Sequence, residues 1–120
     1  MSEPSHKNRP HYTWADYQTW NDDQRWEIIG GEAYLMSPGP TSRHQIISSA
    51  LHAQMYAYFT GKPCRVLAAP MDVRLSDEDV VQPDLLVVCR PDQLTRTHIE
   101  GAPTLVVEIL SASSTSGAFF

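Results

Sequence analysis

Two acidic residues stand beside or within the most apolar stretches of the chain. Asp84 follows Pro83 and precedes four consecutive aliphatic residues, and Glu108 interrupts the aliphatic run at 105–110. An ionised carboxylate in such surroundings is costly unless it is paired, protonated or bound to a metal. If the two acids lie on neighbouring strands, their oxygens could bind a hard cation such as Mg²⁺, whose bound water could attack a phosphodiester. The pair therefore indicates a metal site for hydrolysis.

The same pattern also has a purely structural interpretation. Glu108 could form an ion pair with an arginine such as Arg74, and Asp84 could cap a turn. The presence of two such acids favours a site, but the residue types alone leave both interpretations open.

The neighbouring residues indicate how each acid is positioned. Aliphatic residues on both sides of Glu108 are typical of a strand that is buried on both faces. Pro83 has no backbone donor and suits the first residue of a strand, which places Asp84 at a strand entrance. We therefore expect the two acids to lie on strands of one sheet.

The remaining elements predict a mixed α/β domain of the α+β class. Thr13 can cap a short helix with Asp16 in its first turn, and Gly30-Gly31 predicts a hairpin. One long helix is predicted over 42–62, with a periodic apolar face formed by Ile47, Leu51, Met55 and Tyr58. Strand-like stretches lie at 64–70, 71–75, 79–89 and 104–110. The sequence predicts a mixed sheet with the long helix on one face.

Length and composition limit the class of protein. A chain of 120 residues fits one domain, which we expect over 12–114 between a flexible tail at 1–11 and an irregular end at 115–120. No apolar run is long enough to cross a membrane, and no secretory signal or organic-cofactor motif is present. The net charge of −5 argues weakly against a general nucleic-acid binder.

The two cysteines bear on the compartment. Cys64 and Cys89 stand alone in apolar contexts without metal-ligand spacing. We expect buried free thiols, as in proteins of a reducing compartment, and hence a cytoplasmic protein.

Taken together, several motifs resemble a known family. Pro83-Asp84 before a strand, followed by VVEILS at 106–111, resembles the PD-(D/E)XK nuclease superfamily. The stretches YTWADY, WEIIGGEAYLMSPGPTSRHQ, QPDLLVV and GAPTLVVEILSASS are similar to the Uma-two type of restriction-endonuclease-like proteins. The resemblance implies a restriction-endonuclease-like fold that hydrolyses DNA, with Mg²⁺ (or Mn²⁺) bound between Asp84 and Glu108.

The resemblance also suggests two further site residues. Glu27 matches an additional acid from the N-terminal region, and His44 matches a histidine at the start of the long helix that would act as an acid or base. Each has a structural alternative: Glu27 could be solvated on the hairpin, and His44 could bond a loop carbonyl.

One position departs from the superfamily. The lysine that normally stands two residues after the glutamate is replaced by Leu110, and the only lysines, Lys7 and Lys62, precede Asp84. The Uma-two type resembles superfamily members whose lysine has moved into the C-terminal helix that follows, and we expect this helix to be missing here. We therefore expect impaired cleavage, an uncovered apolar face at 104–110, and a homo-oligomer formed through that face.

Two other functions remain open at this point. The chain could be a non-catalytic remnant of the nuclease fold that serves as an oligomerisation module. It could also be an unrelated α+β binding domain whose buried acids are ion-paired.

Overall fold

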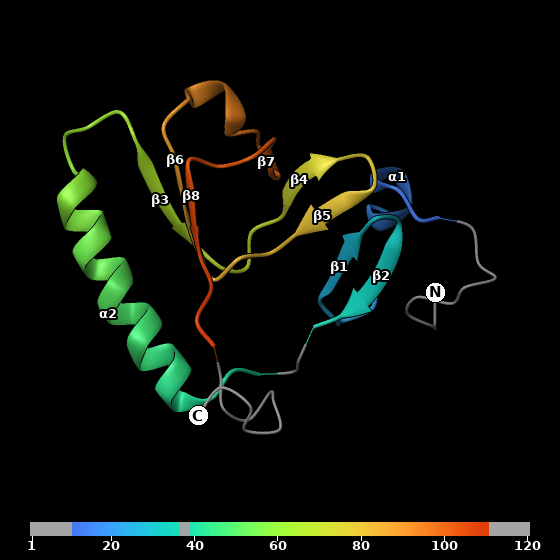
Figure 1. The fold of residues 1–120 in the computed structure, drawn as a ribbon, viewed down its shortest axis with the longest axis horizontal. Helices are drawn as coiled ribbons and strands as arrows, with labels where there is room; N and C mark the ends of the chain where they lie inside the picture. The colour runs from blue at the N-terminus through green and yellow to red at the C-terminus, as the bar shows by residue number, and fades with distance from the viewer. Residues whose placement is uncertain (1–10, 37–38, 111–120) are drawn as a thin grey trace.

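The computed structural model describes residues 11–36 and 39–110, so most of the predicted tail and the whole of the 115–120 end lie outside the described residues. The described chain forms two sheets, one long helix and two short helical turns (Figure 1). In chain order the elements are α1 (Trp14–Tyr17), β1 (Trp26–Ile29), β2 (Glu32–Leu35), α2 (Ser42–Phe59), β3 (Arg65–Ala68), β4 (Val73–Ser76), β5 (Asp79–Val81), β6 (Leu85–Val88), η1 (Pro91–Gln93), β7 (Ile99–Glu100) and β8 (Leu105–Val107).

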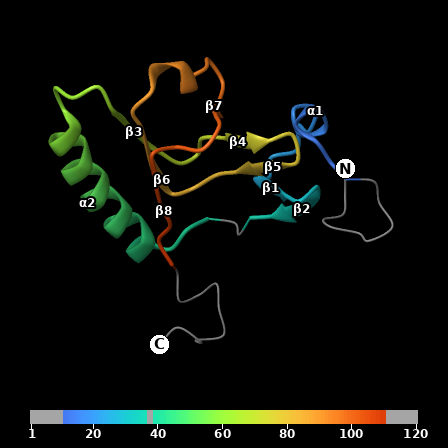
Figure 2. The ribbon, with the colours of Figure 1, turned by 45° about the horizontal axis from the view of Figure 1, so that its top comes forward.

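The strands form a five-stranded sheet in the order β2-β1-β5-β4-β7 and a three-stranded sheet in the order β3-β6-β8. All described pairs are antiparallel except β4 with β7, which makes the larger sheet mixed. In both ribbon views α2 lies beside β3, and the β1–β2 hairpin lies on the other side of the molecule (Figure 2). The predicted mixed α/β architecture of the α+β class is confirmed.

Local sequence signals place the N-terminal elements correctly. The Thr13 side chain and the Asp16 carboxylate bond each other's backbone N–H groups, forming a capping box on α1. Gly30 and Gly31 have φ values of 59° and 82°, a left-handed geometry that a two-residue hairpin turn requires. The turn sets the register of β1 and β2, in which Ile29 pairs with Glu32.

The stretch at 79–89 forms two strands in different sheets. β5 pairs with β1 and β4, whereas β6 pairs with β3 and β8. Residues 82–84 connect them, and Pro83, without an N–H group, cannot continue a ladder there. All four residues of β6 are buried, so this strand forms the centre of the smaller sheet. The crossing at 82–84 therefore joins the two sheets.

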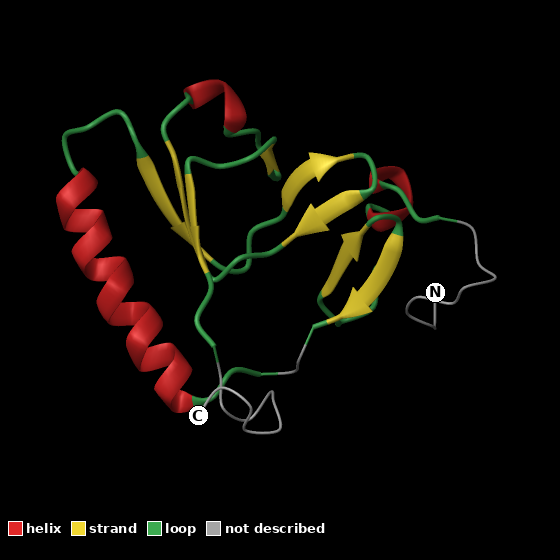
Figure 3. Ribbon diagram, in the orientation of Figure 1, coloured by secondary structure: helices red, strands yellow, loops and turns green. Residues whose placement is uncertain are grey.

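The long helix begins at the predicted residue and ends at Phe59, three residues before the predicted end (Figure 3). Its predicted apolar face is not buried. None of its residues is buried: Leu51 and Met55 are half-buried, and the side chain of Tyr58 is 65% exposed. The reason is that α2 contacts mainly the edge strand β3 and does not cover the face of the sheet. Among the described residues, no helix is both long and apolar enough to cross a membrane.

The expectation that Glu108 lies in a strand buried on both faces is wrong. β8 is the edge strand of the three-stranded sheet, and Leu105 and Val106 are 48% and 47% exposed. Glu108 comes directly after the strand and is itself exposed. An aliphatic run does not distinguish a central strand from an uncovered edge. The exposed apolar surface predicted for 104–110 is present.

The expectation of free thiols is also wrong. Arg65 of β3 pairs with Val88 of β6, so the next residues along the ladder, Cys64 and Cys89, lie directly opposite each other. Their sulfur atoms form a disulfide, with Cα atoms 3.9 Å apart. Because the pairing depends on strand register, two cysteines 25 residues apart gave no local sign of it.

Candidate active site

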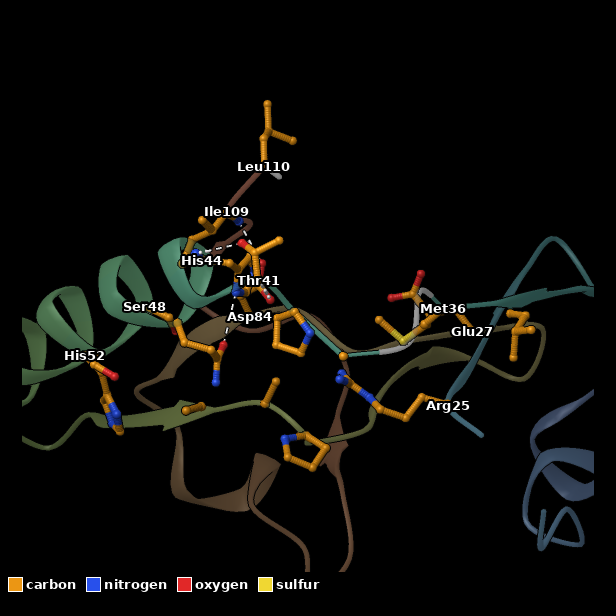
Figure 4. A pocket seen from close by; sticks show the side chains of 18 of the residues that line it. Arg25, Glu27, Met36, Thr41, His44, Ser48, His52, Asp84, Ile109 and Leu110 are labelled. Carbon is orange, nitrogen blue, oxygen red and sulfur yellow. Dashed lines mark hydrogen bonds and ion pairs between the residues drawn. The ribbon is translucent and has the colours of Figure 1, made fainter. Parts of the chain in front are cut away.

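A cleft of about 740 Å³ lies between the start of α2, the β1–β2 hairpin and the entrance of β6. Glu27, His44 and Asp84 line it, together with Arg25 and Ile109 (Figure 4). These residues come from four separate segments of the chain, which meet because 82–84 crosses between the two sheets. Three of the four predicted site residues therefore line one cleft.

Asp84 is fixed by contacts of both its backbone and its side chain. Its backbone carbonyl accepts from Ala69 N at 3.0 Å, which fixes the chain just before β6. In its side chain, Oδ2 accepts a 2.7 Å hydrogen bond from the backbone N–H of Ile109, and Oδ1 lies 3.2 Å from Nε2 of His44. Each carboxylate oxygen has two lone pairs, so both oxygens retain acceptor capacity toward the cleft. Asp84 does not cap a turn, as its structural alternative required.

His44 is positioned by the start of α2. Thr41 is the N-cap and its hydroxyl accepts from the backbone N–H of His44 at 3.1 Å, so His44 lies in the first turn of the helix. Its Nδ1 lies within hydrogen-bonding distance of Oε1 of Gln45, at 3.1 Å. The imidazole side chain is 12% exposed and faces Asp84 across the cleft (Figure 4). No loop carbonyl bonds its ring among the described contacts.

Glu27 is half-buried and fixed by the crossing segment. In β1, Trp26 and Ile28 are buried in the core, so the alternation of a strand turns Glu27 to the opposite face. Its Oε2 accepts a 2.8 Å hydrogen bond from the backbone N–H of Gln82, two residues before Asp84. Glu27 is therefore not a solvated hairpin residue, whereas Glu32 on β2 is exposed as expected.

Glu108 lies against Asp84, although the residue as a whole is exposed. Desolvation, the negative charge of Asp84 and a hydrogen bond with the Asp84 carboxyl group raise the pKa of Glu108 to about 7, and the charge of Glu27 adds to the rise. Two carboxyl groups this close cannot both ionise freely, so the pair holds a proton or recruits a cation. The structure thus places Glu108 near Asp84 and Glu27, and His44 contacts the same Asp84.

Arginine does not neutralise these acids in the described contacts. Arg74, the partner considered for Glu108, instead bonds Glu100 at 2.5 Å and approaches Asp77 at 3.6 Å. The ion-paired interpretation of Glu108 therefore loses the arginine on which it rested.

The donor set bears on which metal could bind. In the described part of the chain, no three or more histidine, cysteine, aspartate and glutamate side chains are gathered so that they could enclose a metal ion. Mg²⁺ keeps several waters and commonly uses one or two carboxylates, whereas a structural zinc site needs four protein ligands. The adjacent carboxylates of Asp84 and Glu108 fit the first requirement and not the second.

Two residues of the site were not predicted from the sequence. Arg25 lines the cleft and donates from Nε to Oε1 of Gln82 at 2.7 Å. The spacing of Arg25, directly before β1, and Glu27, within it, was the available signal because residues two apart in extended chain share a face. Gln82 has no comparable signal, since its role depends on partners far away in the sequence.

Comparison with known proteins identifies the family of the chain. Residues 14–117 match the model of the Uma2 family, described as "Putative restriction endonuclease". The chain belongs to the Uma2 family. This match covers most of the chain and confirms the resemblance drawn from the motifs.

Individual relatives of this Uma2 protein are distant. A crystal structure of a "putative nuclease belonging to DUF820" from Anabaena variabilis is similar in fold, with a TM-score of 0.69 and 18% identity over 89% of this chain and 63% of that one. An uncharacterised protein of Synechocystis sp. is 28% identical over 92 residues, 76% of this chain and 48% of the relative. The chain thus spans about half to two thirds of the length of these proteins.

Proposed function

We propose that this Uma2 protein is a metal-dependent endonuclease that hydrolyses phosphodiester bonds of DNA. The observation that carries the proposal is the adjacent pair Asp84 and Glu108, in which the pKa of Glu108 is raised to about 7. Burial and, after it, the charge of Asp84 disfavour the ionised form of Glu108, and a divalent cation would stabilise that form. Membership of a family described as "Putative restriction endonuclease", and the fold shared with a protein described as a "putative nuclease", support the same reaction class.

Asp84 and Glu108 are the residues that would hold Mg²⁺ or Mn²⁺. Asp84 keeps free lone pairs on both carboxylate oxygens, and Glu108 lies close enough to interact with it. The cation's other positions would keep water. When bound, such a cation lowers the pKa of its water and stabilises negative charge on a phosphoryl oxygen. Glu27 would add negative charge near the pair, and the hydrogen bond from the backbone N–H of Gln82 to its Oε2 fixes its position.

The chain's own residues would handle the protons of the reaction. Hydrolysis adds the water oxygen to phosphorus, breaks one P–O ester bond and transfers a proton to the departing alkoxide. His44 is suited to this transfer because Gln45 holds its Nδ1 while its Nε2 lies beside Asp84 at the cleft, and Nε2 would pass its proton to the alkoxide when the contact with Asp84 opens. Asp84 would orient the imidazole as well as bind the cation.

Plasmid nicking with added Mg²⁺ or Mn²⁺ tests the proposal. We expect nicking by the wild-type protein, and its loss in the Asp84→Asn, Glu108→Gln double variant. The matched control is Glu78→Gln, Asp92→Asn, which makes the same chemical change at two exposed acids away from the cleft. Wild-type protein that neither binds the metal in calorimetry nor nicks DNA would refute the proposal.

A second candidate is a non-catalytic member of the same fold that acts as an interaction module. It is favoured by one observation: the position two residues after Glu108 is Leu110, whose side chain is 63% exposed and has no charge. Metal binding without any nicking that depends on Asp84 and Glu108 would support this candidate over the nuclease.

A further inference from the structure

Arg25 occupies a distinctive place in the cleft. It directly precedes β1, and the strand alternation that buries Trp26 and Ile28 sends Arg25 and Glu27 to the same face. Its backbone carbonyl accepts from Met36 N at 2.9 Å, which ties it to the end of β2. Its side chain points toward the middle of the cleft from the side opposite α2 (Figure 4).

The guanidinium group is held at one nitrogen only. Nε donates to Oε1 of Gln82 at 2.7 Å, and no described hydrogen bond or ion pair engages Nη1 or Nη2. The two outer nitrogens remain available although the carboxylates of Glu27 and Asp84 line the same cleft. Such an arrangement leaves the planar fork open to an anion that offers two oxygens.

Gln82 makes this orientation rigid. It is 7% exposed, and its amide nitrogen donates to the hydroxyl of Tyr17 and to Oδ1 of Asp72, both at 2.8 Å. With both hydrogens of the amide used, its oxygen is directed at Arg25. The backbone N–H of Gln82 also bonds Glu27, so this one buried glutamine positions both the Arg25 guanidinium group and the Glu27 carboxylate.

We propose that Arg25 binds the non-bridging oxygens of the phosphodiester. Its guanidinium group supplies a positive charge that the uncharged Leu110 cannot. Arg25 is the one lysine or arginine among the described residues that line the cleft, whose other ionisable groups include Glu27 and Asp84. A phosphodiester entering this acidic cleft needs a compensating positive charge, and a bidentate fork also fixes its orientation. Gln82 is the positioning residue for Arg25. This inference rests on the proposed nuclease function for its substrate.

The test measures DNA binding separately from cleavage. A fluorescein-labelled DNA duplex is titrated in EDTA at several salt concentrations with wild type, Arg25→Gln, Arg25→Lys and the control Arg65→Gln, an exposed arginine outside the cleft. Because each phosphate contact contributes about one to the slope of log K against log salt, we expect Arg25→Gln to lower that slope by about one. Arg25→Lys should keep the slope, and Arg65→Gln should match wild type. Circular dichroism confirms that each variant is folded.

Cleavage assays then separate the two proposals. If wild type nicks DNA, Arg25→Gln should lower kcat by about 10²–10³, and Arg25→Lys should lie between the two because it keeps the charge but loses the fork. An unchanged salt slope in folded Arg25→Gln overturns the Arg25 proposal whether or not the protein cleaves. A lowered slope without wild-type nicking upholds the anion site and refutes only the nuclease function.

Discussion

Nε2 of His44 lies 3.2 Å from Oδ1 of Asp84, which joins the first turn of α2 to the entrance of β6. Neither side chain is more than 20% exposed, so the contact is made inside the cleft wall. The pair joins an imidazole that can transfer a proton to a carboxylate that can bind a cation.

Replacing His44 by glutamine should lower cleavage while the fold is retained. Loss of one general acid or base typically costs about 10²–10⁴ in rate. The measurement is the nicking rate at saturating Mg²⁺. The control is His52→Gln, because His52 lines the same cleft and contacts Tyr56, not an acid, in the described structure. Equal losses in both variants would argue against a specific role for His44.

Glu108 should make the protein less stable as the pH rises from about 4.5 to about 7. In this window the folded state, with the Glu108 pKa near 7, keeps a proton that the unfolded state, with a pKa near 4.5, releases. The folded state therefore binds more protons, and the free energy of unfolding falls with rising pH and levels off above it. Solvent screening at this exposed residue limits the loss to roughly 1 kcal/mol.

Urea unfolding of wild type and Glu108→Gln across this window measures the effect. The difference between the two curves cancels the contribution of the other acids, and the variant should gain relative stability as the pH rises. Glu78→Gln, at an exposed glutamate, should run parallel to wild type. A Glu108→Gln curve that also ran parallel would mean that the Glu108 carboxyl group is not perturbed.

Reducing the disulfide should destabilise the fold. Cys64 and Cys89 close a loop across 25 residues between β3 and β6, and a cross-link of this length restricts the unfolded chain by roughly 3 kcal/mol. Thermal unfolding with and without dithiothreitol measures the loss. The Cys64→Ala, Cys89→Ala variant should show the reduced stability under both conditions. Peptide mapping that found two free thiols in oxidised protein would contradict the pairing.

Replacing Gln82 by alanine should destabilise the protein as well as loosen the site. The change leaves Arg25, Tyr17 and Asp72 without their shared partner, and an unsatisfied buried polar group costs roughly 1–3 kcal/mol. Chemical denaturation measures this loss against Gln24→Ala, an exposed glutamine whose side chain makes no described hydrogen bond. A loss no larger than the control's would show that the network contributes nothing to stability.

The uncovered edge of β8 should mediate self-association. Leu105 and Val106 are about half exposed on a strand that pairs on one side only among the described residues, which is the geometry for pairing with a second copy. We expect a homodimer in light scattering and a monomer for Val106→Lys, since a charge on an edge strand blocks pairing. Leu75→Lys, which charges an exposed leucine of the other sheet, is the control. A monomeric wild type would refute this expectation.

Residues close together in the sequence carried most of what could be predicted. The Thr13 cap, the Gly30-Gly31 turn, the start of α2 and the position of Asp84 before a strand all depend on a residue and its near neighbours. These interactions form over one turn or one hairpin, and their residue preferences are strong. The family could be recognised from the sequence for the same reason, because its motifs are short runs of neighbouring residues.

What could not be predicted depends on contacts between distant segments. The β3–β6 register brings Cys64 opposite Cys89, the position of β8 at a sheet edge exposes the residues before Glu108, and the crossing at 82–84 lets Gln82 hold both Arg25 and Glu27. Strand pairing partners and sheet order follow from packing of the whole chain, because an aliphatic run suits a central or an edge strand equally well. The acids were visible in the sequence, but their partners emerged with the assembled sheets.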